Sequence, residues 1–502
     1  MATQNRYRRS PGERRASGQP VELELRGGAY QGRMVARQNL RDAAQQGDAA
    51  MEAAGGAGRV VFVDGGIPGE TVRAELTVEK KSFAEGRAVQ IVSPAASRVA
   101  PPCQYFGENG AQRGAVPTGN GLPGERGACG GCQYQHIDYD AQLALKRDIA
   151  ADLMRRQARL PDVEVRPTIA SPTPWRYRNR ARWIVDDDGR PCYHQSSSDR
   201  LLPVALCHIV QPVLDDILGQ LAGPDWRLPL RTLVSEITAR TAIPWTEDDD
   251  PNEPPGPSAP SVLLALHARQ GAKRRDLKMF AGDLGAALPA LDGVTLSAAL
   301  TAGAQPGSGG GLWGVDHFDA RFAGFRFRLS PLTFFQVNEP AAAVLVDLVM
   351  ELLGDLRGKS VLDIYAGAGT FTLPIAAHAE QVLAMENDAL AVDDAQASAR
   401  ANRLANVHVM PGDAADELEG LPVRAAHAAV LDPPRAGVDE RIVAELDRIK
   451  VPRIVYVSCD PATLARDLRR FVDRGYRVES ILPIDLFPQT FHIETVVALS
   501  RQ

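Results

Sequence analysis

The sequence predicts an α/β protein, and three observations lead to this prediction. From about residue 331, apolar runs typical of strands alternate with segments of helical composition. A glycine loop directly follows the first of these runs, whereas residues 21–97 contain shorter strand-like segments. Alternating strands and helices form a mostly parallel sheet with helices on both faces. We therefore expect a Rossmann-like sheet of about seven strands in residues 331–502, a β-barrel in 21–97 and a central α+β domain in 98–330.

The predicted barrel consists of five short segments with Gly or Pro-Gly between them. They read VELELRGG, GRMVARQ, GRVVFVDGG, ETVRAELTVEKK and EGRAVQIVS. Five short alternating strands are typical of an oligonucleotide-binding (OB)-like barrel. A barrel alone identifies no ligand, so nucleic-acid binding and a β module without a ligand both stay open.

A basic stretch, WRYRNRARW, spans residues 175–183 of the central domain. Arg176, Arg178, Arg180 and Arg182 occupy every second position. In a strand, this period would place all four side chains on one face. Such a row of like charges favours an anionic partner, and RNA phosphate is the natural one. The alternative is a charged strand that resists edge pairing.

The composition is that of a globular protein, with 502 residues, 44% hydrophobic and 24% charged. No apolar run approaches the roughly 20 residues of a membrane span. Residues 1–20 are arginine-rich without an apolar core, so they predict a disordered basic tail and not a secretory signal. We expect a cytoplasmic protein without a membrane partner or an obligate protein partner. Its six cysteines are too few for a disulfide scaffold and point to metal binding or catalysis.

The net charge of −6 does not exclude an RNA partner, because the acidic residues are concentrated. Residues 245–261 contain five of them, and without these five the net charge would be −1. This stretch and several others are poor in large apolar residues, so we expect disordered ends or loop insertions there. They are residues 1–20, 40–58, 106–127, 245–261 and 302–312.

Seven strands are expected in the C-terminal region, with helical segments between the first six. The apolar runs lie at 361–366, 381–386, 406–410, 427–431, 453–458, 477–484 and 494–499. Two adjacent strands at the end are usual in class I methyltransferases. Asn338 precedes EPAAAVLVDLVMELLG and is the expected N-cap of a helix. Residues 142–157 also have helical spacing.

The segment VLDIYAGAGTFTLPIA, at 361–376, is a candidate cofactor loop. Gly367 and Gly369 allow the backbone to approach a ligand closely, and Glu386 ends the next strand, where an acid can bind ribose hydroxyls. The full GxGxxG pattern of dinucleotide sites is missing. S-adenosylmethionine is therefore favoured over NAD. Asp413, after the third strand, is a candidate for the adenine side.

Two further strands end in residues that suit catalysis. Asp432 begins the turn in LDPPRAG, after the fourth strand, and Cys459 follows the fifth strand in VSCDPATLARD. Parallel strands bring both to the edge that carries the glycine loop. Cys459 is then a candidate nucleophile, the alternative being a small core residue. Asp432 suits a clamp for a target amine, but Arg435 stands where such enzymes usually have an aromatic residue; a tight turn is the other interpretation.

Two more groups are candidates for chemistry. Glu494 starts the last strand, in FPQTFHIETVVAL, where a carboxylate can serve as a general base; a surface glutamate is the alternative. Four cysteines suit either zinc or an iron–sulfur cluster, and their spacing does not decide between the two. They are Cys103, Cys129, Cys132 and Cys207, with Cys192 left over as a structural residue.

Taken together, the chain resembles the bacterial RNA uracil-5-methyltransferase family, of the TrmA and RumA type. The motifs are FFQVNEP (334–340), DIYAGAGTF, LDPPRAG, SCDPATLARD and FPQTFHIE, in the family's order. Residues 21–97, including VFVDGGIPGE, look like its TRAM domain. The four cysteines and CGGCQYQH look like its [4Fe–4S] site. The resemblance covers nearly the whole chain outside the insertions.

The resemblance implies a mechanism and a set of roles. A cysteine thiolate adds to carbon 6 of uracil, which makes carbon 5 nucleophilic toward the sulfonium methyl group. Cys459 would be that nucleophile, and Glu494 would remove the proton from carbon 5. The matching cofactor positions are Gln336, Tyr365, Glu386 and Asp432, with Thr370 and Asp413 as weaker matches; Asp432 would also face the uracil.

The resemblance leaves the target RNA open. A TRAM domain with cluster cysteines favours 23S ribosomal RNA over transfer RNA, by analogy only. Two alternatives stay open: an RNA amino methyltransferase that uses the LDPPR turn, and a non-catalytic iron–sulfur RNA-binding protein. The chain departs from the family at Asp460, where SCNP is usual, at Ala366, where a cysteine is frequent, and in the long gap from Cys103 to Cys129.

Overall fold

The computed structural model describes residues 20–38, 58–80, 82–107, 128–244, 260–298, 300 and 309–501. The chain separates into two compact units. The first comprises Met1–Ile149, Gln195–Asp199 and Gln489–Phe491, and the second comprises Ala150–His194, Arg200–Pro488 and His492–Gln502. This division does not follow the expected domain boundaries, which stay predictions. The basic tail and most of the other low-complexity stretches lie outside the described residues.

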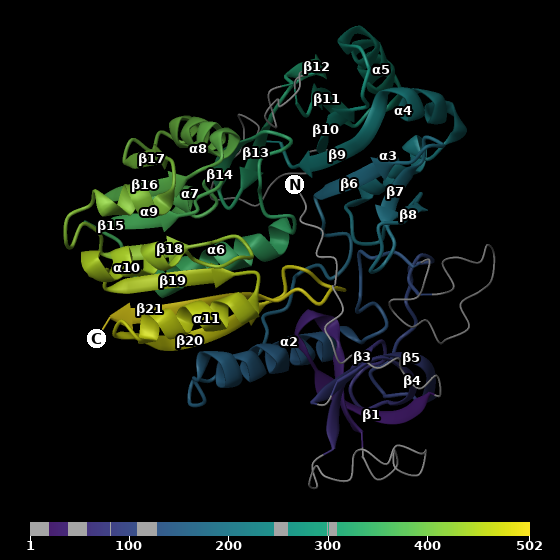
Figure 1. Ribbon diagram of the computed structural model, residues 1–502. Coiled ribbons are helices and arrows are strands. Elements are labelled where there is room, and N and C mark those ends of the chain that lie inside the picture. The colour runs from purple at the N-terminus through teal and green to yellow at the C-terminus, as the bar shows by residue number, and fades with distance from the viewer. Residues whose placement is uncertain are drawn as a thin grey trace. The chain divides into compact units, whose positions relative to one another are not determined.

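The first unit contains a closed five-stranded barrel, drawn in purple and blue in Figure 1. Its strands pair in the order β1-β2-β3-β5-β4, with only β3 and β5 parallel. Side chains alternate between buried and accessible along the strands, which fills the barrel with small and branched apolar residues. The predicted barrel is therefore confirmed. The strands are β1 (Val21–Gly28), β2 (Met34–Gln38), β3 (Arg59–Asp64), β4 (Thr71–Glu79) and β5 (Phe83–Ser93).

A buried ion pair fixes the turn that leads into β4. The Glu70 side chain is fully buried and accepts hydrogen bonds from Arg98 Nη2 at 2.9 Å and from the Ile67 backbone at 2.9 Å. Because both partners are charged and the carboxylate is out of water, removing either one would leave an uncompensated charge.

The helix expected over 142–157 is present as α2 (Tyr139–Leu153), and its last turn widens into a π-helix (Met154–Ala158).

The second unit contains two seven-stranded sheets, and the first of them is the central sheet. It runs in the order β12-β11-β10-β9-β6-β7-β8, followed by the separate hairpin β13-β14. Helices α3, α4 and α5 pack against it. The strands are β6 (Arg180–Val185), β7 (Pro191–His194), β8 (Leu201–Pro203), β9 (Val234–Ala242), β10 (Ser261–Ala268), β11 (Leu291–Leu296), β12 (Gly311–Gly314), β13 (Phe318–Phe322) and β14 (Phe325–Leu329). The helices are α3 (Pro212–Leu221), α4 (Arg227–Leu233) and α5 (Arg274–Ala287).

The C-terminal sheet runs in the order β17-β16-β15-β18-β19-β21-β20, in green and yellow in Figure 1. All neighbours are parallel except β21, which is antiparallel to both β19 and β20. Its strands are β15 (Ser360–Ile364), β16 (Gln381–Glu386), β17 (Val407–Pro411), β18 (Ala428–Leu431), β19 (Arg453–Ser458), β20 (Tyr476–Ile484) and β21 (Glu494–Arg501). All seven predicted strands are thus confirmed.

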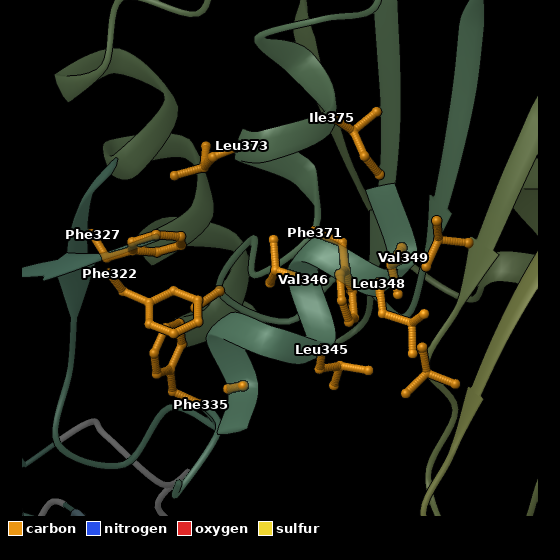
Figure 2. Packing of buried hydrophobic residues seen from close by; sticks show 14 of the residues in the cluster. Phe322, Phe327, Phe335, Leu345, Val346, Leu348, Val349, Phe371, Leu373 and Ile375 are labelled. Carbon is orange, nitrogen blue, oxygen red and sulfur yellow. The ribbon is translucent and has the colours of Figure 1, made fainter. Parts of the chain in front are cut away.

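Helices cover both faces of this sheet, because its strands are apolar on both sides. Neighbouring residues of one strand, such as Val430 and Leu431, belong to separate core clusters. Figure 2 shows one cluster, in which Leu345, Val346 and Val349 of α6 pack near the sheet. The helices are α6 (Glu339–Leu353), α7 (Thr372–Ala376), α8 (Ala389–Ala401), α9 (Ala414–Glu419), α10 (Glu440–Ile449) and α11 (Pro461–Val472).

The expected N-cap of α6 is also confirmed, since the Asn338 side chain accepts a hydrogen bond from the Ala341 backbone at 3.3 Å. Within the part of the chain that the structure describes, no helix is both long enough and apolar enough to cross a membrane.

The expectation of four arginines on one strand face is wrong. Strand β6 begins only at Arg180, because Arg176 has a left-handed φ of 56° that interrupts the extended backbone. Arg176 pairs with Asp215, and Arg178 donates to the Arg180 carbonyl. Only Arg180 and Arg182 share the strand face. These side chains therefore find partners within the protein, and no row of four charges forms.

Candidate active site

Four strand ends meet at one edge of the C-terminal sheet. Tyr365 follows β15, Glu386 ends β16, Asp432 follows β18 and Cys459 follows β19. The four strands are parallel, so their carboxyl ends share an edge. The structure thus brings together Glu386, Asp432 and Cys459, which the sequence placed at strand ends, and Tyr365, which the family resemblance implied.

Glu494 joins the same edge from the opposite chain direction. It is the first residue of β21, whose Thr495 pairs with Ser458 of the antiparallel β19. Cys459 follows Ser458 directly, so the register sets Glu494 beside the thiol. The Glu494 side chain is buried. The alternative interpretation of Glu494 as a surface residue is therefore wrong.

The glycine loop after β15 has the backbone that the sequence required. Gly367 and Gly369 have φ values of 56° and 95°, a region that favours glycine. Beside Gly367, a Cβ atom would meet nothing within 4 Å, which leaves open space next to the backbone. The Glu386 carboxylate accepts hydrogen bonds from the Gly367 backbone at 2.8 Å and the Asp388 backbone at 2.7 Å. Glu386 therefore ties the glycine loop to the end of β16.

Asp363, in the middle of VLDIY, is a buried acid that the sequence reasoning missed. Its carboxylate accepts a hydrogen bond from Thr372 Oγ1 at 2.5 Å, while its Oδ1 has no hydrogen-bond partner among the described residues. Burial raises the pKa of Asp363 to about 7, and the Glu386 carboxylate adds to the rise. The signal was available, because a charged residue inside an apolar strand is unusual.

The environment of Cys459 keeps its thiol protonated. Burial raises the pKa of Cys459 to about 12, and the Glu494 and Asp432 carboxylates raise it further, while Arg435 acts in the opposite direction. These effects require that the three charged groups lie near the sulfur atom. Cys459 is half-buried and is therefore still accessible from solvent. A lone structural cysteine would have no need of such neighbours.

The two carboxyl groups beside the thiol also hold their protons more tightly than usual. Burial raises the pKa of Glu494, and the nearby Asp432 carboxylate raises it further, against the effect of Arg435. Burial and Asp363 raise the pKa of Asp432 in the same way. Two acids close together cannot both ionise easily. Perturbed acids of this kind, placed around a thiol, are typical of functional sites.

Arg435 is the cation that faces this acidic group. Its Nη2 lies 3.3 Å from both ring nitrogens of His492, so the guanidinium lies against the imidazole ring. The His492 ring in turn meets Phe487 edge-on, with 5.7 Å between the centroids. Arg435 itself is exposed. It can therefore contact a bound substrate as well as the acids.

The end of SCDPATLARD holds the LDPPRAG turn in place. The buried Asp467 carboxylate accepts hydrogen bonds from the Val438 backbone and the Tyr456 hydroxyl, both at 2.9 Å. It also accepts from Arg466 Nε at 2.8 Å and from Arg470 at 3.1 Å. The turn that carries Asp432 is therefore anchored through α11.

This anchorage explains the glycine in LDPPRAG. Gly437 has a φ of 80°, and a Cβ atom there would lie directly against the Asp467 carboxylate and the Arg466 guanidinium. Arg466 Nη2 donates to the Ala436 carbonyl at 2.7 Å. Only glycine allows the turn to approach α11 so closely.

Comparison with known proteins identifies the chain. The family model for tRNA (uracil-5-)-methyltransferase matches residues 319–502. An uncharacterised RNA methyltransferase of Halalkalibacterium halodurans is 31% identical over 452 residues, which cover 88% of this chain and 92% of that protein. One of Gloeobacter violaceus is 32% identical over 463 residues, with the same shares. The chain belongs to the RNA (uracil-5-)-methyltransferase family. It is an S-adenosylmethionine-dependent RNA methyltransferase.

A solved structure shows the same fold as this methyltransferase. The tRNA (uracil-54, C5)-methyltransferase of Pyrococcus abyssi, determined in complex with S-adenosyl-L-homocysteine, aligns with a TM-score of 0.64 at 21% sequence identity. The alignment covers 95% of this chain and 100% of that one.

The remaining cofactor candidates of the methyltransferase occupy different settings. Gln336 and Thr370 are buried, and the Gln336 carbonyl accepts a hydrogen bond from Asn179 at 3.1 Å. Asp413 is the N-cap of α9 and pairs with Arg441 at 3.2 Å. Because its carboxylate already contacts two partners, Asp413 is a weaker cofactor candidate than Gln336, as the family resemblance in the sequence also implied.

The expected iron–sulfur or zinc site finds no support in the structure. Among the described residues, no three His, Cys, Asp or Glu side chains are arranged to hold a metal ion. Three of the four predicted ligands belong to the first compact unit and Cys207 to the second. Cys129 Sγ accepts a hydrogen bond from the Gly131 backbone at 3.4 Å. The assignment of these cysteines to a cluster therefore has no structural support, and no step of the proposed reaction depends on one.

Cys192 lies in the core, as expected for a structural residue. It is fully buried, and its thiol donates to the Arg190 carbonyl at 3.3 Å.

Proposed function

We propose that this methyltransferase transfers a methyl group from S-adenosylmethionine to carbon 5 of a uridine in RNA, through a covalent adduct with Cys459. The observation that carries the proposal is the gathering of Cys459, Asp432 and Glu494 at the edge of the sheet that also bears the glycine loop. A strand order with two adjacent C-terminal strands and one antiparallel member supports a class I methyltransferase fold.

Cys459 first gives up its thiol proton to solvent, to which it is accessible, and the thiolate sulfur then forms a bond with carbon 6 of uracil. The electron pair of the 5,6 double bond then moves toward carbon 5 and the carbonyl at carbon 4. Carbon 5 attacks the methyl carbon, the bond from this carbon to the sulfonium sulfur breaks, and S-adenosylhomocysteine is the product. Covalent catalysis of this kind divides one difficult step into easier ones.

The last step restores the aromatic ring of the base. Glu494 takes the proton from carbon 5, the 5,6 double bond re-forms, and the bond from carbon 6 to Cys459 breaks. Burial raises the pKa of Glu494, which makes its carboxylate a stronger base than an exposed one. Before methyl transfer, the positive sulfonium of the cofactor would favour ionisation of the neighbouring thiol and acids, and this charge is lost when S-adenosylhomocysteine forms.

The cofactor would lie across the glycine loop. Glu386 would bind the ribose hydroxyls, and Gln336 and Tyr365 would supply further contacts. Asp432 faces both cofactor and uracil. Thr370 and Asp413 are the weaker candidates, because Asp413 already caps a helix.

The RNA would be recognised outside the sheet edge as well. The barrel of the first unit is TRAM-like, and such barrels bind nucleic acids. In the second unit, Phe334 is 61% exposed two residues before Gln336, and exposed aromatic rings stack on bases. The uridine must leave its stack to reach Cys459. By analogy we place the target in 23S ribosomal RNA, with transfer RNA as the alternative, and the reaction in the cytoplasm.

The test is to identify the methylated nucleoside. Purified protein is incubated with S-adenosylmethionine and either a 23S ribosomal RNA transcript or unmodified transfer RNA, and the digested RNA is analysed by mass spectrometry. We expect 5-methyluridine from the ribosomal transcript. Methylation of an exocyclic amine would instead support an amino methyltransferase, and RNA binding without any methylation would support a non-catalytic binding protein.

A further inference from the structure

We propose that Asn179, Arg180 and Arg240 of the central domain are positioning residues for segment 330–338, and that they set the affinity for S-adenosylmethionine by fixing Gln336. The inference rests on the proposed function, since Gln336 is assigned to the cofactor there. Asn179 and Arg180 come from the arginine-rich stretch that the sequence assigned to RNA.

Hydrogen bonds from these three residues reach carbonyl groups along the whole segment. Arg240 Nη1 donates to the carbonyl of residue 330 at 2.9 Å, and Arg180 Nη2 to that of residue 332 at 3.4 Å. The Asn179 side chain donates to the carbonyl of Gln336 at 3.1 Å, and the Asn179 backbone to that of residue 337 at 2.9 Å. The segment has no regular secondary structure of its own, so these bonds determine its path.

A second set of contacts holds the segment from helix α8 and from the hairpin β13-β14. The buried Asp394 of α8 accepts from the Ser330 backbone at 2.8 Å and from Thr333 Oγ1 at 2.7 Å. Phe335 packs against both Phe322 and Phe327, with ring centroids 5.2 and 5.3 Å away, and Figure 2 shows the three side chains together. Gln336 follows Phe335 directly, so its place depends on both sets of contacts.

Burying the charged Arg240 side chain costs free energy, which argues against a role that only fills space in the core. Its side chain is fully buried, and its Nε and Nη2 have no hydrogen-bond partner among the described residues. Burial lowers the pKa of Arg240 to about 9, and Arg180 lowers it further, against the effect of Asp394 and Glu339. An apolar residue would fill the same volume without a buried charge. What Arg240 adds is a directed bond to the segment.

The test compares cofactor affinity in two variants with that in a matched control. Asn179→Ala removes the bond to the Gln336 carbonyl, and Arg240→Met removes the bond to the start of the segment. Thr241→Val, next to Arg240 on β9, also removes one buried bond to a backbone carbonyl, that of Ser261 at 2.8 Å. That bond lies away from the segment. The full-length proteins are titrated with S-adenosylhomocysteine by calorimetry, and their melting temperatures are recorded.

We expect the dissociation constant to rise on the order of tenfold in Asn179→Ala and Arg240→Met, since one directed hydrogen bond has about that worth. The KM for S-adenosylmethionine should rise with little change in kcat, because the lost contact stabilises the bound ground state and the transition state equally. Thr241→Val should lower the melting temperature but keep the wild-type affinity. Arg240→Lys keeps a donor and the charge, so it should recover most of the affinity. If Arg240→Met does not fold, the loss of affinity in Asn179→Ala decides the test.

Wild-type affinity in Asn179→Ala and Arg240→Met, or an equal loss in Thr241→Val, would overturn the inference. Failure of the wild-type protein to bind S-adenosylhomocysteine would instead overturn the proposed function.

Discussion

Cysteines after buried strands are common, and the charges around Cys459 are what set it apart. Burial, Glu494 and Asp432 all raise the pKa of the thiol, while Arg435 lowers it. Under the proposed mechanism, the site would hold the Cys459 thiol in its unreactive, protonated form until S-adenosylmethionine binds. The positive sulfonium of the cofactor would then favour the thiolate, which would link thiolate formation to cofactor binding.

The aspartate in SCDP should make the thiol harder to ionise. Asp460 contributes to the raised pKa of Cys459, and it also caps α11 by accepting from the Ala462 and Thr463 backbones at 3.0 Å. Asparagine caps helices as well as aspartate does. Asp460→Asn should therefore lower the thiol pKa while changing the unfolding free energy by less than about 0.5 kcal/mol. The measurement is the pH dependence of Cys459 alkylation by iodoacetamide.

The matched control for that experiment is Asp439→Asn. Asp439 is the N-cap of α10, where it accepts from the Arg441 backbone at 2.8 Å. Asp439 is not among the main charges that shift the pKa of the Cys459 thiol. An equal shift of the alkylation profile in both variants would contradict a local effect of Asp460.

Asp363 should make the protein less stable as the pH rises. Its pKa is raised from 3.8 to about 7 in the folded state, so the folded protein binds the proton more tightly. This contribution to stability is fully present below pH 3.8 and is lost as the pH rises through 7. Asp363→Asn removes this pH dependence, because the amide does not ionise. Above pH 7, where the wild type buries a charged carboxylate, the unfolding free energy of the variant should exceed that of the wild type by up to about 4 kcal/mol. Urea unfolding at pH 4, 6 and 8 measures this difference, and an advantage that stays constant across the series would contradict it.

At the scale of elements, the sequence predicted correctly those strands whose burial shows directly in the pattern of apolar residues. The seven C-terminal strands follow their apolar runs because parallel strands are buried on both faces. The alternation in WRYRNRARW failed, because a left-handed residue at Arg176 ends the extended chain and alternation does not encode that. The link from Asp467 to the LDPPRAG turn was also invisible, since it joins residues 29 positions apart. The same holds for the bonds from Asn179 to segment 330–338.

The LDPPRAG turn should not tolerate a side chain at Gly437. Gly437→Ala adds left-handed strain and a clash with Asp467, so we expect a loss of roughly 2–4 kcal/mol in unfolding free energy. Activity should fall as well, because the turn carries Asp432. Gly475→Ala separates the two causes, since Gly475 has a φ of 86° but its Cβ would meet nothing within 4 Å. It should lose only about 1–2 kcal/mol and keep its activity. Equal losses in both variants would show that the contact with α11 is unimportant.

At the scale of the whole molecule, the chain combines a barrel, a central sheet and a methyltransferase sheet. Family membership and the fold agree with the sequence motifs, including the barrel of the first unit. The metal site that the four cysteines and the family resemblance suggested finds no support among the described residues.

Trapping the adduct tests the central claim most directly. Protein, S-adenosylmethionine and 5-fluorouridine-substituted ribosomal RNA are mixed and run on a denaturing gel beside Cys459→Ala. Fluorine cannot leave carbon 5 as a proton does, so an adduct with Cys459 should persist after methyl transfer. We predict a band of lower mobility in the wild type alone. No such band, together with continued methylation of ordinary RNA by Cys459→Ala, would contradict the proposed nucleophile.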